Sequence, residues 1–198
     1  MKNVFSNTKK GILMVAMMAT VIGYANEMSL VNYGRDLRAT ALTITNAKEG
    51  DLLSIKDGYG TTLYKEIIEQ TGTYNKGFDL TDLPDGEYFF EIDKDMEINS
   101  IPFSVKSSAV TFKKEKETTV FKPYVREEYD LVYITKLAPN KEPLSVKIYG
   151  LYNGVSELLY TETIEGIQNI ERAFKLYEGE YKLVFASNDR EFIKYINK

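Results

Sequence analysis

The chain has 198 residues and contains no histidine, no cysteine and no tryptophan. The lack of histidine excludes a Ser-His-Asp triad, an HExxH zinc site and an imidazole base that titrates near neutral pH. The lack of cysteine excludes a thiol nucleophile, a disulfide, a CxxC metal site and the lipid-bearing cysteine of a lipoprotein. The sequence therefore excludes enzymes and metal sites that depend on histidine or cysteine.

The N-terminus has the pattern of an export signal. Three lysines lie within the first ten residues, and residues 11–25 follow without a single charge. Gly23 and Ala25 place small side chains at positions −3 and −1 of a cut before Asn26, as secretory signal peptides do. A helix of 15 residues rises about 22 Å, which is short of the ~30 Å hydrocarbon core of a membrane. We predict a cleaved signal peptide over residues 1–25; an uncleaved membrane anchor is the alternative.

Charge and length limit the partners and the architecture of the exported chain. Residues 1–25 include three lysines and no acid, so cleavage makes the net charge more negative than −4. An acidic surface argues against nucleic acid and anionic lipid as partners. Without cysteines in an oxidising compartment, the hydrophobic core alone must hold the fold. The length is sufficient for one large or two small domains.

The mature sequence has the composition and periodicity of β-strands. It includes 15 tyrosines and 10 phenylalanines, and short apolar–polar alternations are separated by turn signals such as residues 57–60 and 83–86. In one such run, Tyr88, Phe90 and Ile92 fall on one face. No window shows a helical stripe, and the charged residues 113–117 are predicted to form an exposed hairpin tip. Strand-like runs with regular turn signals are typical of β-sandwiches.

Four segments of the first half recur, in the same order, in the second half. Ordered matches whose offset changes only at turns favour an internal duplication. The matched pairs are residues 53–56 with 146–149; Tyr64, Glu66 and Ile68 with Tyr160, Glu162 and Ile164; Phe78 and Leu80 with Phe174 and Leu176; and Gly86, Glu87 and Tyr88 with Gly179, Glu180 and Tyr181.

The repeat predicts the domain organisation. We expect an all-β fold of two tandem, immunoglobulin-like (Greek-key), antiparallel β-sandwich units, of about seven and about six strands. The second unit lacks a counterpart of the hairpin at residues 110–121. One continuous sandwich with a shared core is the alternative. The predicted boundaries are a flexible lead-in at 26–36, unit one at 37–122, a linker at 123–127 and unit two at 128–198.

Two tyrosines occupy equivalent places after a turn. Tyr88 and Tyr181 each follow a Gly-Glu pair. This pattern predicts a tyrosine corner, in which the hydroxyl bonds a backbone group upstream. The preceding glycines, Gly86 and Gly179, suit turn positions with positive φ. A ligand-binding role for either tyrosine is the alternative.

Two acid-rich segments are candidates for metal sites. Asp93, Asp95 and Glu97 alternate, as oxygen ligands of calcium can. The spacing lacks the glycine and the twelfth-position glutamate of the known calcium loop, so we interpret the segment as an exposed turn. Asp79, Asp82 and Asp85 recur at intervals of three, but Asp85 belongs to a turn signal. We expect neither a metal nor another cofactor.

No catalytic motif is present. The sequence has no GxSxG elbow, no P-loop and no GxGxxG, and no pair of carboxylates stands out for glycoside hydrolysis. We therefore expect no enzymatic activity and assign no catalytic residue. Aromatic surfaces can bind sugars, and Tyr149, Tyr152 and Tyr160, near Asn153 and Gly154, are the better candidates for an exposed cluster.

Residues 144–198 resemble a known family. The segment Val146-Lys147-Ile148-Tyr149-Gly150-Leu151-Tyr152-Asn153-Gly154, followed by residues 174–176, 179–183 and 192–198, resembles the C-terminal sorting domain of the type IX secretion system. Residues 53–93 resemble the same pattern. The resemblance implies a secreted immunoglobulin-like fold for both copies and a sorting role for a terminal copy. It implies no binding or catalytic residue.

These observations predict a non-enzymatic protein that is exported to the periplasm, the cell surface or the medium. We expect a binding, adhesion or envelope-associated interaction module whose partner is a protein or glycan at the cell envelope. A secreted carbohydrate-binding module and a sorting-domain-like protein of the type IX pathway are the alternatives. No stable membrane insertion is expected after cleavage. Because the second unit lacks the final hairpin, it is expected to leave a strand edge open.

Overall fold

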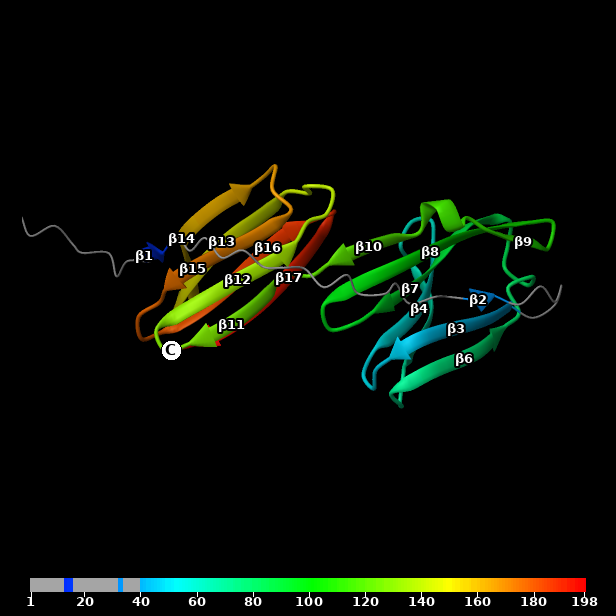
Figure 1. The fold of residues 1–198 in the computed structure, drawn as a ribbon, viewed down its shortest axis with the longest axis horizontal. Coiled ribbons are helices and arrows are strands. Elements are labelled where there is room, and N and C mark those ends of the chain that lie inside the picture. Colours follow the sequence, from blue (N-terminus) through cyan, green and yellow to red (C-terminus); the bar gives the residue numbers. More distant parts are fainter. Residues whose placement is uncertain (1–12, 16–31, 34–39) are drawn as a thin grey trace, which may run out of the picture. The chain divides into compact units, whose positions relative to one another are not determined.

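The computed structural model describes residues 13–15, 32–33 and 40–198 (Figure 1). Within these residues every regular element is a β-strand except a single 3-10 turn, η1 (Lys114–Lys116). The strands form antiparallel sheets that pack as sandwiches, so the predicted all-β sandwich class is confirmed. No helix among these residues is long and apolar enough to cross a bilayer.

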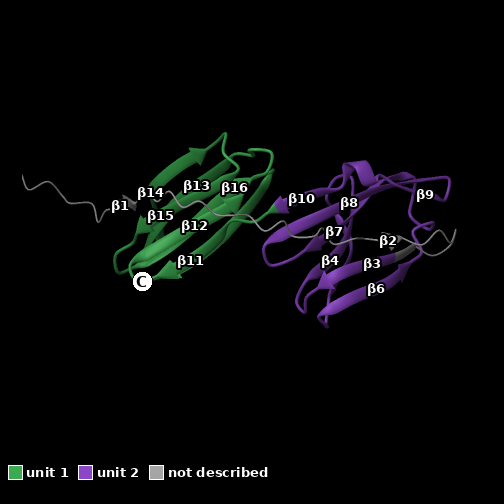
Figure 2. Ribbon diagram, viewed as in Figure 1, with its two compact units in different colours: residues 1–21, 121–198 green, residues 22–120 purple. Residues whose placement is uncertain are grey.

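The chain divides into two compact units, Ile22–Val120 and Phe121–Lys198 (Figure 2), and β1 belongs with the second. We call them the N-terminal and C-terminal units. The strands of the N-terminal unit are β2 (Asn32–Tyr33), β3 (Thr40–Ala47), β4 (Leu52–Asp57), β5 (Thr62–Ile67), β6 (Gly72–Phe78), β7 (Gly86–Asp93), β8 (Glu97–Lys106), β9 (Ala109–Phe112) and β10 (Thr118–Phe121). Those of the C-terminal unit are β1 (Leu13–Val15), β11 (Tyr124–Glu128), β12 (Leu131–Leu137), β13 (Leu144–Tyr152), β14 (Val155–Ile164), β15 (Asn169–Lys175), β16 (Glu180–Ser187) and β17 (Arg190–Asn197).

The two units share their strand order. The N-terminal unit has the sheets β2-β3-β6 and β10-β8-β7-β4-β5, and β9 also pairs with β8. The C-terminal unit has the sheets β1-β15-β12-β11 and β14-β13-β16-β17. Without β1, β9 and β10, the two arrangements coincide strand for strand. In both units the chain crosses between the two sheets at three equivalent places, after β3, β5 and β6 and after β12, β14 and β15. Such crossings are typical of Greek-key sandwiches.

The register agrees as well. In each unit a buried isoleucine of the central strand pairs with a tyrosine of the edge strand and with a core residue of the other neighbour. The pairs are Ile55 with Tyr64 and Phe90, and Ile148 with Tyr160 and Leu183. A register shift follows at the next position in both units. This likeness is what a duplication would produce, and the duplication itself stays a prediction.

Several boundaries differ from those expected. Residues 123–127, predicted as a linker, lie almost wholly in β11, which pairs with β12 from Tyr124↔Thr135 to Glu128↔Leu131. The chain thus begins the C-terminal sandwich where a linker was expected, because Tyr124 and Val125 offer apolar surface despite the charges that follow. Residues 113–117 are no hairpin tip, since β9 and β10 both pair with β8 on either side of η1.

The N-terminal predictions fall mostly outside the described residues. Of the predicted signal peptide at 1–25, only Leu13–Val15 is described, as a strand that pairs with β15. Of the predicted lead-in at 26–36, only Asn32–Tyr33 is described, as a strand that pairs with β3. The remaining residues of both segments lie outside the described part of the chain.

Each unit has its own hydrophobic core between its two sheets. In the N-terminal unit, Phe90 and Phe103 are fully buried with ring centroids 5.3 Å apart. In the C-terminal unit, Phe174 and Phe185 are fully buried among aliphatic side chains. Burying one such side chain stabilises a fold by about 1.5–3 kcal/mol. These cores come from the inward positions of the alternating runs and replace the disulfides that the sequence cannot form.

The predicted tyrosine hydrogen bonds are confirmed. The Tyr88 hydroxyl donates to the carbonyl of Pro84 at 2.8 Å, and the Tyr181 hydroxyl donates to the carbonyl of Tyr177 at 2.9 Å. Gly179 has the expected positive φ of 150°. The prediction of a positive φ at Gly86 was wrong. A Cβ at Gly86 would lie 3.3 Å from the Tyr88 hydroxyl oxygen, so any larger residue there would require the Tyr88 ring to shift slightly.

Candidate functional site

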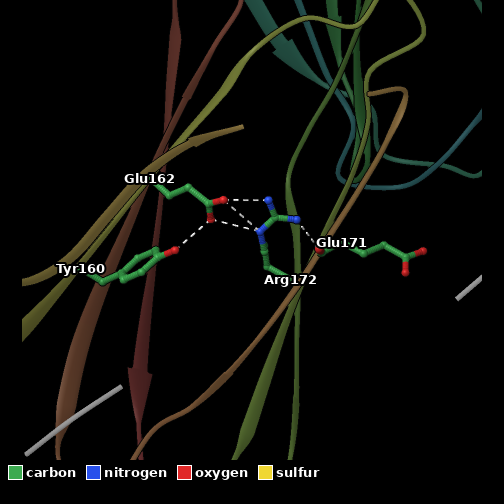
Figure 3. A network of polar contacts seen from close by, with 4 residues as sticks. All are labelled: Tyr160, Glu162, Glu171 and Arg172. Carbon is green, nitrogen blue, oxygen red and sulfur yellow. Dashed lines mark hydrogen bonds and ion pairs between the residues drawn. The ribbon is translucent and has the colours of Figure 1, made fainter. Parts of the chain in front are cut away.

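A polar cluster joins the two sheets of the C-terminal unit (Figure 3). Arg172 on β15 donates from Nη2 to Glu162 Oε1 at 2.7 Å and from Nε to Oε2 at 3.0 Å. The Tyr160 hydroxyl donates to the same carboxylate at 2.9 Å. The hydrogen bonds from Arg172 lower the pKa of Glu162, and burial is the main cause that raises the pKa of Tyr160. The cluster therefore holds a paired charge between β14 and β15.

The N-terminal unit has the same cluster at the matched positions. Lys76 on β6 pairs with Glu66 on β5, which also accepts hydrogen bonds from the hydroxyls of Tyr64 and Tyr74. The hydrogen bond from Lys76 is the largest cause that lowers the pKa of Glu66. Burial raises the pKa of Tyr74 to about 12. Because both units contain this arrangement, we interpret it as a structural tie between sheets.

The outer face of the β14-β13-β16-β17 sheet differs from that of its counterpart. Tyr149, Lys182 and Tyr195 lie side by side across three strands, with Tyr149 opposite Lys182 and Lys182 opposite Tyr195. Lys182 Nζ lies 5.9 Å from the centre of the Tyr149 ring. The next row on the same face contains Val184 and Ile193. We call this surface the C-terminal face; it consists of Lys147, Tyr149, Leu158, Lys182, Val184, Ile193 and Tyr195.

The C-terminal face is mainly apolar, and all of its residues except the buried Val184 are exposed or half-buried. Tyr195 is 62% exposed, Leu158 49% and Ile193 47%. Strand pairing places Leu158 opposite Tyr149 at the far edge of the sheet. Side chains directly opposite on one face of an antiparallel pair are about 5 Å apart, so these residues form a contiguous surface. Contiguous exposed apolar surface on a soluble protein marks interaction sites.

The equivalent outer face of the N-terminal unit is apolar at Phe89, which holds the position of Lys182, but differs at four other matched positions. Where the C-terminal unit has Tyr149 and Val184, the matched positions hold Lys56 and Glu91, whose side chains pair at 2.7 Å. Strand β8 pairs with β7 as β17 pairs with β16, which fixes the matched positions. Ser100 and Pro102 of β8 hold the places of Ile193 and Tyr195. Most inward positions of both units stay apolar; Lys136 of the C-terminal unit is an exception. The two units thus share a core and differ on one face.

The tyrosines chosen from the sequence do not form a single cluster. Tyr149 lies on the C-terminal face, whereas Tyr160 faces the core, with its ring 5.0 Å from that of Phe174. The Tyr152 ring lies over Gly150, where an added Cβ would come within 2.7 Å of it. The expected exposed cluster of these three was therefore wrong, because the bulge in β14 and the parity of β13 place them on opposite sides of the sheet.

Sequence reasoning missed Tyr195 and Ile193, although both occupy outward positions of an alternating run. It also missed Lys136, which is buried on the inward side of β12 and donates to the carbonyl of Leu137 at 3.1 Å. Burial lowers the pKa of this lysine. Its matched position in the N-terminal unit is the buried Ile44. The sequence did contain a signal for its burial, because Lys136 alternates with Val132 and Ile134 and so falls on the same, inward side of the strand.

The acid-rich segments form turns and ion pairs. Asp93 and Glu97 flank the turn between β7 and β8, where Lys94 pairs with Glu97 at 3.4 Å. Asp95 lies 3.8 Å from Lys48. Asp79 caps a local turn by accepting from the backbone N–H of Thr81 at 3.1 Å. In the part of the chain that is described, no group of three or more acidic side chains is arranged to hold a metal ion.

Comparisons with known proteins assign no family. No model of a known protein family matches the chain, and no curated protein matches it. The resemblance of residues 144–198 to a sorting domain therefore stays an expectation. Among solved structures, the chain matches a biofilm-associated protein described as its BSP domain, with 12% identity and a TM-score of 0.26. The match covers 81% of this chain and 27% of that one, and a likeness this low does not bear on function.

Proposed function

We propose that this protein is an exported, non-enzymatic module that binds a protein partner at the cell envelope through the C-terminal face. The observation that supports this function is the contrast between matched positions of the two units. Most core positions are apolar in both units. On one outer face, Tyr149, Val184, Ile193 and Tyr195 hold the positions of an ion pair, a serine and a proline. The fold does not require that change, since the N-terminal unit lacks it.

The composition of the C-terminal face favours a protein partner. Protein interfaces have an apolar centre enriched in tyrosine and other aromatic residues, and a polar rim. Val184, Ile193 and Leu158 supply the aliphatic part, and Lys147 and Lys182 supply positive charge in a chain whose net charge is −4. The complementary partner presents an apolar patch with carboxylates at its edge.

A quantitative test measures binding of the purified protein to isolated cell envelopes. The double substitution Leu158→Ser/Tyr149→Ser removes two contacts of the C-terminal face without touching β17. Leu63→Ser/Tyr59→Ser is the matched control, since Leu63 is also 49% exposed and Tyr59 is fully exposed in the N-terminal unit. We expect the first variant to bind at least about tenfold more weakly, the scale of one or two interface hot spots, and the control to bind normally. Equal binding by both variants would contradict the proposal.

A glycan is the second candidate ligand. Tyr149 and Tyr195 flank Lys182 on one flat face, with one strand between them, so two rings and a cation face solvent together. This arrangement replaces the tyrosine set expected from the sequence. Titration with envelope polysaccharides, followed by tyrosine fluorescence, tests it in a chain without tryptophan. Saturable binding to a polysaccharide free of protein, abolished by Tyr195→Ala, would favour a glycan ligand over a protein partner.

A further inference from the structure

Among the described strands, β17 ends its sheet with a regular edge to which no other strand pairs. The turn that precedes it consists of Asn188 and Asp189, both with positive φ, so Ser187 and Arg190 close a two-residue hairpin. At the other end, Gly179 and Lys198 exchange two backbone hydrogen bonds of 3.0 Å. Hydrogen-bonded pairs alternate along an antiparallel ladder. The backbone groups that point away from β16 are therefore those of Glu191, Ile193, Tyr195 and Asn197.

The corresponding edge of the N-terminal unit is covered. Strand β8 occupies the position of β17, and both β9 and β10 pair with it. Among the described strands, the other long edges have features that hinder pairing. Strands β5 and β14 each contain a register shift, and β6 contains two glycines. Strand β17 has eight residues, continuous pairing with β16, and neither glycine nor proline.

One feature of β17 restricts which strand can join it. Lys194 is exposed on the inward side of the strand, at the position that the buried Ile101 occupies in the N-terminal unit. A charge at such a position disfavours indiscriminate edge pairing. A partner strand must therefore place an aromatic or acidic side chain opposite Lys194 rather than another cation.

A second β17 meets this requirement in one register. When a two-fold axis normal to the sheet relates two antiparallel copies of β17, the numbers of each opposed pair of residues add up to the same total. That total must be even for outward side chains to lie opposite outward side chains. Centring the pair on Phe192 would oppose Arg190 to Lys194, and centring it on Lys194 would oppose two lysines. Centring it on Ile193 opposes Ile193 to itself, Lys194 to Phe192, and Glu191 to Tyr195, with no like charges opposed.

We propose that a second copy of this chain pairs its β17 with β17 in antiparallel register centred on Ile193. The pairing satisfies the free backbone groups of Glu191, Ile193 and Tyr195 on both edges. It also places each Lys194 over the partner's Phe192, where a cation and a ring attract. It extends the sheet through both copies and doubles the C-terminal face. The inference does not depend on the proposed function, because it concerns the edge of the sheet and not its ligand.

The absence of cysteine allows a direct test by single-cysteine cross-linking. Opposed residues in this register have Cα atoms about 5.5 Å apart, within the range that a disulfide spans. Under mild oxidation, Ile193→Cys is expected to form a covalent dimer at least about tenfold faster than Lys194→Cys, which faces Phe192 in this register. Ile67→Cys, on an exposed edge of the N-terminal unit, is the control for random collision. Equal rates for all three variants would overturn the proposal.

The mass of the unmodified protein in solution provides a second test. Light scattering is expected to give the mass of two chains, and Ile193→Lys to give one, because it opposes two lysines at the axis. Circular dichroism would verify that this exposed substitution leaves the fold intact. A single-chain mass for the unmodified protein at every concentration would refute the pairing, and retained envelope binding in that case would leave the proposed function standing.

Discussion

Replacing Arg172 by methionine tests the polar tie between the sheets of the C-terminal unit. Methionine keeps the apolar stem and removes the guanidinium, which makes hydrogen bonds of 2.7 and 3.0 Å to Glu162 and one of 2.9 Å to the carbonyl of Glu171. Hydrogen bonds to charged groups are worth about 1.5–3 kcal/mol, and a fully buried pair costs more to break. The Arg172 and Glu162 side chains are 20% and 23% exposed, so water replaces part of the loss. We expect the variant to lose about 2 kcal/mol of unfolding free energy at pH 7.

The stability loss caused by Arg172→Met is expected to depend on pH in a definite direction. Arg172 holds the pKa of Glu162 below its ordinary value of 4.5. A carboxylate whose pKa is lower in the folded state stabilises the fold above the unfolded pKa, and this stabilisation is lost as the pH falls through the folded pKa. The difference between the unmodified protein and Arg172→Met is therefore largest near neutral pH. It shrinks below about pH 4.5, where the carboxylate becomes protonated.

Urea unfolding followed by circular dichroism, repeated between pH 7 and pH 3, measures both quantities. The two units can unfold in separate transitions, so the loss is assigned to the transition that Arg172→Met shifts. A loss below about 0.5 kcal/mol at pH 7 would refute the assignment of a stabilising tie, since exposed ion pairs already contribute this much. A loss that stays constant down to pH 3 would show that the ion pair is not its cause.

Two further predictions concern the tyrosines and the N-terminus. Tyr88→Phe and Tyr181→Phe should each cost about 1 kcal/mol in thermal or urea unfolding, since each deletes one hydrogen bond. Their effects should add in the double variant because the residues lie in separate units; an unchanged stability in either single variant would contradict the role of its hydroxyl. N-terminal sequencing of the exported protein should begin at Asn26, and an intact Met1 on exported protein would remove the predicted cleavage.

The fold class could be predicted because β-alternation is a local property. Tyr88, Phe90 and Ile92 alternate in sequence, and all three are buried in the structure. The turns at residues 57–60 and 83–86 followed from glycine, proline and aspartate in the same way. The strand β11 was missed because its pairing with β12 is non-local and its sequence is dominated by charge. Such a strand forms because the edge of a neighbouring strand is available for pairing, and the sequence of the segment alone does not predict that pairing.

The candidate face was less predictable than the fold. Outward positions of a strand are apolar for many reasons, and only the pairing of β13, β16 and β17 shows that Tyr149, Lys182 and Tyr195 are neighbours. The bulge in β14 separates Tyr160 from Tyr149 and cannot be located from spacing alone. The matched positions of the N-terminal unit then identify which outer residues the fold itself does not need.

Hydrogen exchange tests the central claim, that the two units share a core while the C-terminal unit alone has a binding face. Amide exchange is measured by mass spectrometry on the free protein and on the protein bound to isolated envelopes. We predict slower exchange on binding in β14, the edge of the C-terminal face that the proposed β17 pairing leaves free, and no change in β5 and β8 of the N-terminal unit. Protection confined to the N-terminal unit, or equal in both units, would contradict the claim.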